Sequence, residues 1–336
     1  MKKTLSLAAV MTVISAPAFA ANMENPLYMP HSREVYSKTT GGVMYKITDA
    51  TLHQRLRDHD GEVEFPVWRA SEEIGVGVTD RWMVHGVIGY TYDGDIDRQG
   101  FHLGRLGTTY RVIQTSDDIV WDLYGDLHMG GIQKMKGAYQ GTATAGTFDY
   151  RNYSNGRWGV HVGSKVGKTW SRLTASVFAE VLKTWGNDNN EINVSELMLA
   201  PSMPVTAVGV PSKISAELKS TWEINAGANL FYQIDDRWSG GFGFRYNHHA
   251  DNGVKSISTE IPTAMGRTVA AAFVDKLANM KDEFNEYIST ITIARQMTDC
   301  LQLAWYLDYT FDDGHEKSSN STNFKAETGL RLNLRF

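Results

Sequence analysis

The feature that most limits how this chain can fold is a two-residue alternation of apolar and polar side chains, clearest at the C-terminus. In NFKAETGLRLNLRF the apolar residues fall on one face of an extended chain, and the charged and amide residues fall on the other. A β-strand places successive side chains on opposite sides, so this pattern predicts a strand with one apolar and one polar face. The preceding segment, 301–311, alternates in the same way.

Similar alternation recurs along the chain and predicts about 12 strands. The expected strands are 34–47, 62–79, 82–93, 101–115, 118–131, 157–168, 171–185, 213–234, 237–249, 283–298, 301–311 and 324–336. The alternation slips near 72–73 and near 285–288, where we expect bulges or loop extensions. An even number of antiparallel strands is typical of single-chain bacterial outer-membrane barrels.

The connectors between the expected strands alternate in length. Short polar turns are expected around 79–81, 115–118, 168–169, 235–237 and 298–299, and longer connectors at 48–61, 94–100, 132–156, 186–212, 250–282 and 312–321. This alternation is the pattern of a transmembrane β-barrel with short periplasmic turns and long extracellular loops. The sequence therefore predicts an all-β fold, an antiparallel up-and-down barrel of about 12 strands.

The N-terminus has the pattern of a secretory signal peptide. Lys2 and Lys3 precede an apolar run over 5–14, and small residues at 18 and 20 form a cleavage site. The apolar run is about half of the ~20 residues that a membrane-spanning helix needs. We therefore expect a signal peptide at 1–20, a periplasmic N-terminal segment at 21–33 and an outer-membrane β-barrel at 34–336. The segment 22–33 is too short for a domain, which leaves a periplasmic tail or a small lumenal plug as the alternatives.

Composition excludes several classes of function. The net charge of −5 is spread along the chain and gives no basic surface for nucleic acid. Cys300 is the one cysteine, which excludes an internal disulfide framework and a CxxC site. His248 and His249 are adjacent and would point to opposite faces of a strand, so no metal site is expected. We expect no cofactor.

Two short polar turns and the C-terminus carry a resemblance to a known class. TDRW and DDRW each open an alternating strand, and LRLNLRF ends the chain. These features resemble porin-like and channel-like outer-membrane β-barrel proteins of Gram-negative bacteria. The Asp-Arg-Trp turns are also similar to those of barrel transporters for aromatic and other hydrophobic compounds.

The resemblance implies a location in the bacterial outer membrane. The partners that it implies are outer-membrane lipids and lipopolysaccharide, together with the barrel-assembly machinery, which would read the terminal strand ending in Phe336. Trp82, Trp170, Trp238 and Phe336 are expected at the boundary between water and lipid. The sequence leaves monomer and trimer open.

If the apolar face meets lipid, the polar face lines the lumen. The candidate lumen residues are Arg105, Arg111, Asp122, Asp126, Lys165, Glu180, Lys219, Glu223, Arg245, Asp308, Lys325, Glu327 and Arg331. A barrel of a dozen strands lies between small filled barrels and open porins. The mixed charges fit a narrow polar channel for small solutes. They equally fit salt bridges that fill the lumen of a structural or surface-binding barrel.

The connector 250–282 contains apolar residues near helical spacing. Val269, Phe273, Leu277 and Met280 predict a short amphipathic helix. Folded inward, this helix would constrict the pore; otherwise it would cap the rim.

The segment NYSNGRW raises an enzymatic alternative. Its Ser154 resembles the nucleophile of outer-membrane phospholipase A, but Asn152 stands where that family has the histidine base. An amide cannot take the serine proton, so we expect that the protein is not an enzyme, with a lipid-active hydrolase as a minor alternative. An autotransporter translocator would also have a dozen strands but needs a passenger, and only about a dozen residues separate the expected cleavage site from the first strand.

Overall fold

The computed structural model describes residues 22–47, 66–93, 98–130, 132–140, 144–151, 158–185, 190–199, 212–250, 254–260, 283–312 and 323–336. Every regular element in these stretches is a β-strand. Within them, no helix is long and apolar enough to cross a membrane. The predicted all-β class is confirmed.

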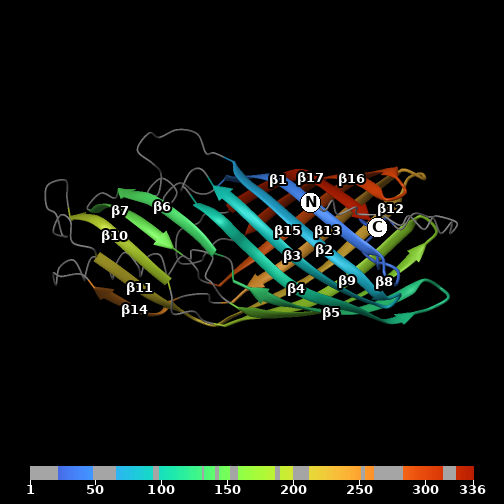
Figure 1. The fold of residues 1–336 in the computed structure, drawn as a ribbon, viewed down its shortest axis with the longest axis horizontal. Helices are drawn as coiled ribbons and strands as arrows, with labels where there is room; N and C mark the ends of the chain where they lie inside the picture. The colour runs from blue at the N-terminus through green and yellow to red at the C-terminus, as the bar shows by residue number, and fades with distance from the viewer. Residues whose placement is uncertain are drawn as a thin grey trace, which may run out of the picture.

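Long strands form the barrel wall, and short strands extend it at one end (Figure 1). The 12 long strands are β1 (Val35–Ile47), β2 (Val67–Thr79), β3 (Trp82–Asp93), β4 (Arg98–Gln114), β5 (Ile119–Met129), β8 (Gly159–Trp170), β9 (Leu173–Thr184), β12 (Thr221–Gln233), β13 (Trp238–His249), β15 (Phe284–Thr298), β16 (Leu301–Asp312) and β17 (Asn323–Arg335). The short strands are β6 (Ile132–Gln140), β7 (Thr144–Arg151), β10 (Asn190–Leu199), β11 (Ser212–Leu218) and β14 (Val254–Glu260).

The long strands close on themselves in chain order. Each pairs antiparallel with the next, and the pairs β5–β8, β9–β12 and β13–β15 pass over the short strands. The last pair joins β1 to β17, from Tyr36 opposite Arg335 to Ile47 opposite Phe324. Closure removes the unpaired edge that an open sheet would leave. The sequence prediction of a closed barrel of about 12 antiparallel strands is confirmed.

The alternation explains which way each side chain points. In β16, Gln302, Ala304 and Tyr306 are buried inside the barrel, whereas Leu303 and Trp305 are exposed on its outer surface. Each second residue of the strand therefore contributes to an apolar outer face. Exposing such a face to water is unfavourable, whereas a lipid environment suits it.

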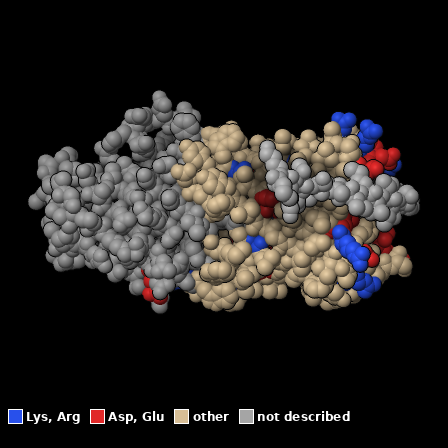
Figure 2. All heavy atoms as spheres, in the orientation of Figure 1, with Lys and Arg blue, Asp and Glu red and all other residues tan. Residues whose placement is uncertain are grey.

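Exposed aromatic side chains gather near both ends of the long strands. Near the short turns these are Trp82, Tyr110, Trp170, Tyr232, Trp238 and Phe336; near the opposite end they are Tyr45, Trp68, Tyr92, Trp158, Trp185 and Trp222. In Figure 2, charged side chains gather at the right-hand end, and the band beside them carries few. Amphipathic rings at two levels are typical of the two boundaries of a membrane.

Three details of the sequence interpretation are wrong. Around Glu72 the register with β1 and β3 is continuous. Glu72 points outward and accepts hydrogen bonds from the Ser37 and Thr39 hydroxyls at 2.5 and 2.6 Å. Around 285–288 the register is also continuous, and the outward Asn285 accepts a hydrogen bond from the Tyr246 hydroxyl. Polar residues on the outer face, and not bulges, interrupt the apolar pattern at both places.

The third detail is the extent of the strands. The expected strand 213–234 divides at 219–220 into β11 and β12, which pair with different neighbours. In addition, β6, β7, β10 and β14 occupy parts of segments that were expected to be loops. These strands pair in the order β4–β6–β7–β10–β11–β14 and so continue the wall beyond the barrel.

Candidate channel lumen

The barrel encloses a cavity of about 750 Å³. All of the 12 long strands contribute lining residues, and charged and amide side chains predominate among them. Apolar side chains such as Phe178 and Leu182 interrupt this polar surface. The cavity therefore offers hydrogen-bonding groups of both signs to anything that enters it.

Residues 22–34, which we call the N-terminal plug, form one wall of this cavity at the end of the barrel with the short turns. The first contacts of the plug are to β12, β13, β16 and β17. The Asn22 amide donates to Gln233 and Ser239, at 3.2 and 2.8 Å. Glu24 accepts hydrogen bonds from Arg331 and from the fully buried Asn333.

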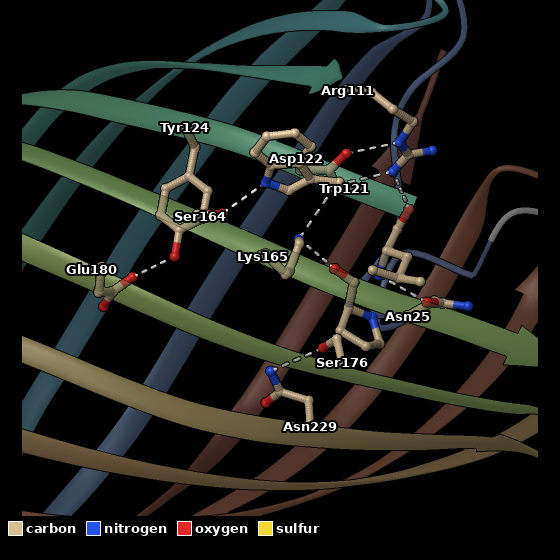
Figure 3. A network of polar contacts seen from close by, with 12 residues as sticks. Asn25, Arg111, Trp121, Asp122, Tyr124, Ser164, Lys165, Ser176, Glu180 and Asn229 are labelled. Atoms are coloured by element: carbon tan, nitrogen blue, oxygen red, sulfur yellow. Dashed lines mark hydrogen bonds and ion pairs between the residues drawn. The ribbon is translucent and has the colours of Figure 1, made fainter. Parts of the chain in front are cut away.

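The middle of the plug binds the opposite side of the wall. Asn25 donates to Thr174 on β9 at 3.2 Å. The backbone carbonyl oxygens of Pro26 and Leu27 accept hydrogen bonds from Lys165 and Arg111, respectively. Figure 3 shows these side chains converging on the plug from β4 and β8. The plug therefore crosses the lumen, because it binds strands on both sides of the barrel.

The end of the plug joins the first two strands. Tyr28 packs edge-on against the Tyr36 ring, with centroids 6.0 Å apart, and its hydroxyl donates to Glu34 at 2.7 Å. Burial and the Glu34 carboxylate raise the pKa of Tyr28 above its usual value, so this hydroxyl stays protonated as a donor. The backbone N–H of Ser32 donates to Asp80 in the turn between β2 and β3. The plug is thus anchored at both of its ends.

Arg111, Asp122 and Lys165 form a buried charge cluster beside the plug, which we call the plug-side cluster. The Arg111 guanidinium donates to both carboxylate oxygens of Asp122, at 2.9 and 3.2 Å, and Lys165 Nζ lies 3.9 Å from the same carboxylate. Asp122 is fully buried. Two cations surround this anion, and each also donates to a plug carbonyl oxygen, so the cluster holds the plug to the wall.

A second group of titratable residues lies on β3, β5, β8 and β9. His85 Nε2 and His161 Nδ1 lie 2.9 and 2.8 Å from the two oxygens of Asp126. His161 Nε2 lies 3.3 Å from Glu180, which also accepts a hydrogen bond from the Tyr124 hydroxyl. These residues line the cavity.

A third group lies near the opposite end of the barrel. We call Glu223, His249, Glu286 and Lys325 the far cluster. The two ring nitrogens of His249 lie 3.0 Å from Glu286 and 3.5 Å from Glu223, and Lys325 donates to Glu286 at 2.9 Å. Nearby, Glu327 accepts hydrogen bonds from Tyr306 and Arg69.

Most of the predicted lumen residues lie on the inner side of the wall. The residues that line the cavity are Arg105, Asp126, Lys165, Glu180, Glu223, Arg245, Asp308 and Arg331. Arg111, Asp122, Lys325 and Glu327 bind inward-facing partners in the clusters described above. The exception is Lys219, which is exposed on the connection between β11 and β12 because the expected strand 213–234 divides there.

The predicted interface aromatics lie on the outer surface, and the remaining predicted residues lie in parts of the chain that the structure does not describe. Trp82, Trp170, Trp238 and Phe336 are exposed at the short-turn end of the wall. Val269, Phe273, Leu277 and Met280 of the expected constriction helix lie outside the described residues, as does Ser154.

Sequence reasoning missed the joint contribution of His85, His128 and His161, and it gave a lumenal plug only as one of two interpretations of the N-terminal segment. In the two-residue alternation, each of these histidines falls on the polar face of its strand, and this was the one indication in the sequence that they point into the lumen. Their approach depends on the register between four strands, and local spacing does not encode that register.

No protein-family model and no curated protein sequence matches the chain. Among solved structures, an outer-membrane channel from Pseudomonas putida F1 is similar, with a TM-score of 0.55 and 12% identity over 92% of this chain and 97% of that one. The toluene transporter TodX from Pseudomonas putida matches with a TM-score of 0.46 and 9% identity, over 94% and 93%. The translocator domain of the autotransporter NalP from Neisseria meningitidis gives 0.48 and 9%, over 92% and 90%. The first of these similarities identifies the fold as that of an outer-membrane β-barrel.

Proposed function

We propose that this protein lies in the outer membrane and is a passive channel for small solutes, with a narrow polar lumen that the N-terminal plug closes at the short-turn end. The observation that carries the proposal is the polar cavity of about 750 Å³ with the plug as one of its walls.

The outer surface supports the location. Trp82 and Tyr92 are both exposed on β3 and are separated by ten residues, or about 33 Å of strand. At a tilt of about 40° this length spans about 25 Å, the height of the apolar band of an outer-membrane barrel. The C-terminal strand β17, with Phe336 exposed beyond it, is our proposed recognition element for the barrel-assembly machinery.

The lining favours small polar solutes over ions of one sign. Arg105, Arg245 and Arg331 share the cavity with Asp126, Glu180 and Glu223, so neither sign dominates the lining. A lumen with both signs attracts neither anions nor cations strongly, because opposed charges cancel their fields within a short distance. We therefore expect weak ion selectivity.

The test is conductance in planar bilayers and solute uptake by liposomes, with the unmodified protein and a plug variant. In the variant, 22–31 is replaced by a Gly/Ser sequence of equal length, which removes the hydrogen bonds of the Asn22 and Glu24 side chains to Ser239 and Asn333. It also removes the side chains that keep the plug backbone beside Arg111 and Lys165. We expect the current through the variant to rise severalfold. Asp236→Ala is the matched control, since it alters the same end of the barrel in an exposed turn.

The second candidate is a structural or surface-binding barrel whose lumen is filled by ion pairs. The fully buried pair of Arg111 and Asp122 favours it. On this alternative, the plug variant passes neither ions nor solutes, and its main defect is lower thermal stability. The expectation that the protein is not an enzyme is tested by incubating it with phospholipid and lipid A, where we expect no turnover.

A further inference from the structure

Histidine and carboxylate side chains converge at one place on the lumen wall. Asp126 and His128 lie on β5, and His161 lies on β8. One possible ligand atom from each of these three residues lies within 4.8 Å of the other two. His85 on β3 adds a ring nitrogen 2.9 Å from Asp126 Oδ1. All four residues line the cavity, so an ion entering the lumen reaches them.

The backbone register creates this convergence. His85, Gly107, Asp126 and His161 are directly opposite one another on β3, β4, β5 and β8. A Cβ atom on Gly107 would collide with both the Asp126 carboxylate and the His85 ring. Glycine at this position leaves the room in which the two side chains meet across β4.

The protons of His161 point to a cation at this place. Its two ring nitrogens face two carboxylates, Asp126 at 2.8 Å and Glu180 at 3.3 Å. A neutral imidazole carries one N–H and therefore donates to one of them only. If Nε2–H donates to Glu180, the Nδ1 lone pair faces an anionic oxygen, and that contact becomes favourable with either a second proton on Nδ1 or a metal ion between the two atoms.

Two ring nitrogens at the same place lack hydrogen-bond partners among the described residues: His128 Nε2 and His85 Nδ1. Asp126 Oδ1 is paired with His85 Nε2 at 2.9 Å, and the Asp126 side chain is 6% exposed. Leaving a buried imidazole nitrogen unpaired is costly. An ion shared with Asp126 and His161 would give His128 Nε2 a partner.

We propose that the lumen binds one divalent transition-metal ion through Asp126, His128 and His161, with His85 beside it. Imidazole nitrogen with one carboxylate is a ligand set for Zn²⁺, Cu²⁺ or Ni²⁺ and not for Mg²⁺ or Ca²⁺. Glu180 is the outer partner that holds the His161 ring through Nε2, and Tyr124 and Asn225 in turn donate to Glu180 at 2.8 and 3.2 Å.

The local charges permit a cation despite a neighbouring arginine. Arg105 acts electrostatically on Asp126 and His128 and opposes a second positive charge. Against it stand the carboxylates of Asp126, Glu180 and Glu73, of which Glu73 also interacts electrostatically with Arg105. Lys38 also acts on Glu73 and Arg245 acts on Glu180, while Glu223 adds a fourth carboxylate near His128. Four carboxylates against three cations leave a net negative charge when the histidines are neutral, so the site stays favourable for a divalent ion.

The test uses the folded, tag-free protein in detergent after removal of metals by a chelator. Titration with Co²⁺ is followed by its visible ligand-field absorption, and calorimetry with Zn²⁺ gives the stoichiometry. We expect one ion per chain and a loss of affinity of about tenfold or more in His128→Ala and His161→Ala. His128→Ala is the decisive variant, since His128 Nε2 has no hydrogen bond in the described structure to lose.

His249→Gln is the matched control, because His249 is another lumen histidine between carboxylates. It should leave Co²⁺ absorption unchanged. No saturable binding by the unmodified protein, or equal affinity in His128→Ala, would overturn the proposal and leave His161 as a doubly protonated imidazolium. Binding is measured without any current, so the result is independent of whether the barrel conducts.

Discussion

The plug-side cluster and the far cluster use similar charges in different surroundings. In the plug-side cluster, Asp122 is fully buried, and both of its cations also bind backbone carbonyl oxygens of the plug. In the far cluster, Lys325 is 28% exposed, and Glu286 binds Asn247, His249 and Lys325, which all belong to the barrel wall.

The difference separates two uses of an ion pair. A pair within the wall joins strands that backbone hydrogen bonds already hold, so it adds little. A buried pair that also reaches the plug couples the stability of the wall to the closure of the lumen. We therefore expect substitutions in the plug-side cluster to change both unfolding and conductance, and substitutions in the far cluster to change neither strongly.

The largest effect is expected from Arg111→Met. This change leaves the buried Asp122 carboxylate with Lys165, 3.9 Å away, as its one charged partner among the described residues, and it removes the hydrogen bond to Leu27. Breaking a buried ion pair from one side typically costs about 3–5 kcal/mol of unfolding free energy. Urea unfolding in lipid vesicles, followed by tryptophan fluorescence, measures the loss, and bilayer conductance should rise in the same variant.

The double variant Arg111→Met with Asp122→Leu is its control. Removing both charges leaves no unpaired carboxylate, so most of the stability should return while the plug stays weakly held. A loss below about 1 kcal/mol in Arg111→Met alone would show that Lys165 already neutralises Asp122 and would contradict the comparison.

A smaller effect is expected from Glu24→Ala in the plug. Glu24 accepts hydrogen bonds from Arg331 and from the buried amide of Asn333, so its loss should cost about 1–3 kcal/mol. Conductance should again rise. Glu24→Gln keeps an acceptor oxygen for Asn333 and should recover part of both properties. Equal currents in all three proteins would mean that the plug does not close the lumen.

Lys325→Ala tests the far cluster. Glu286 keeps its contact with His249 at 3.0 Å, and the lysine is partly exposed, so we expect a loss of about 1 kcal/mol or less. Conductance should stay as in the unmodified protein. A loss as large as that of Arg111→Met would remove the distinction between the two clusters.

The barrel could be predicted from sequence because its causes are local. The two-residue alternation in β16 and β17 predicts which face of each strand is apolar. The even number of strands and the alternating connector lengths predict that the sheet closes into a barrel. The exceptions are informative. Glu72 interrupts the apolar pattern but not the strand, because the Ser37 and Thr39 hydroxyls on the adjacent strand β1 donate hydrogen bonds to its carboxylate. That compensation involves residues about 35 positions away in the chain.

The candidate site could be predicted only in part. The two-residue alternation predicted that Arg111 and Asp122 face the lumen, and the mixed charges there fitted salt bridges. The meeting of His85 with Asp126 depends on the absence of a side chain at Gly107, one strand away from each, and on the register of three strands. The contacts between the plug and the charge cluster beside it join residues more than 80 positions apart, such as Leu27 and Arg111, and no periodic pattern marks them.

The smallest effect is expected where a carboxylate is fully solvated, in the turn before β13. Asp235 Oδ1 accepts the backbone N–H groups of Arg237 and Trp238 at 2.8 and 2.7 Å, and these bonds lower the pKa of its carboxyl. A carboxyl whose pKa is lowered by folding stabilises the fold above its ordinary pKa of about 3.9, and this contribution disappears as the pH falls through the folded-state pKa. Asp235→Ala should therefore be slightly less stable than the unmodified protein at pH 7 and equal to it in strong acid. Unfolding curves at both pH values check this, with Asp236→Ala as the neighbouring carboxylate control. A difference that persists in acid would assign the effect to turn geometry and not to the ionised carboxylate.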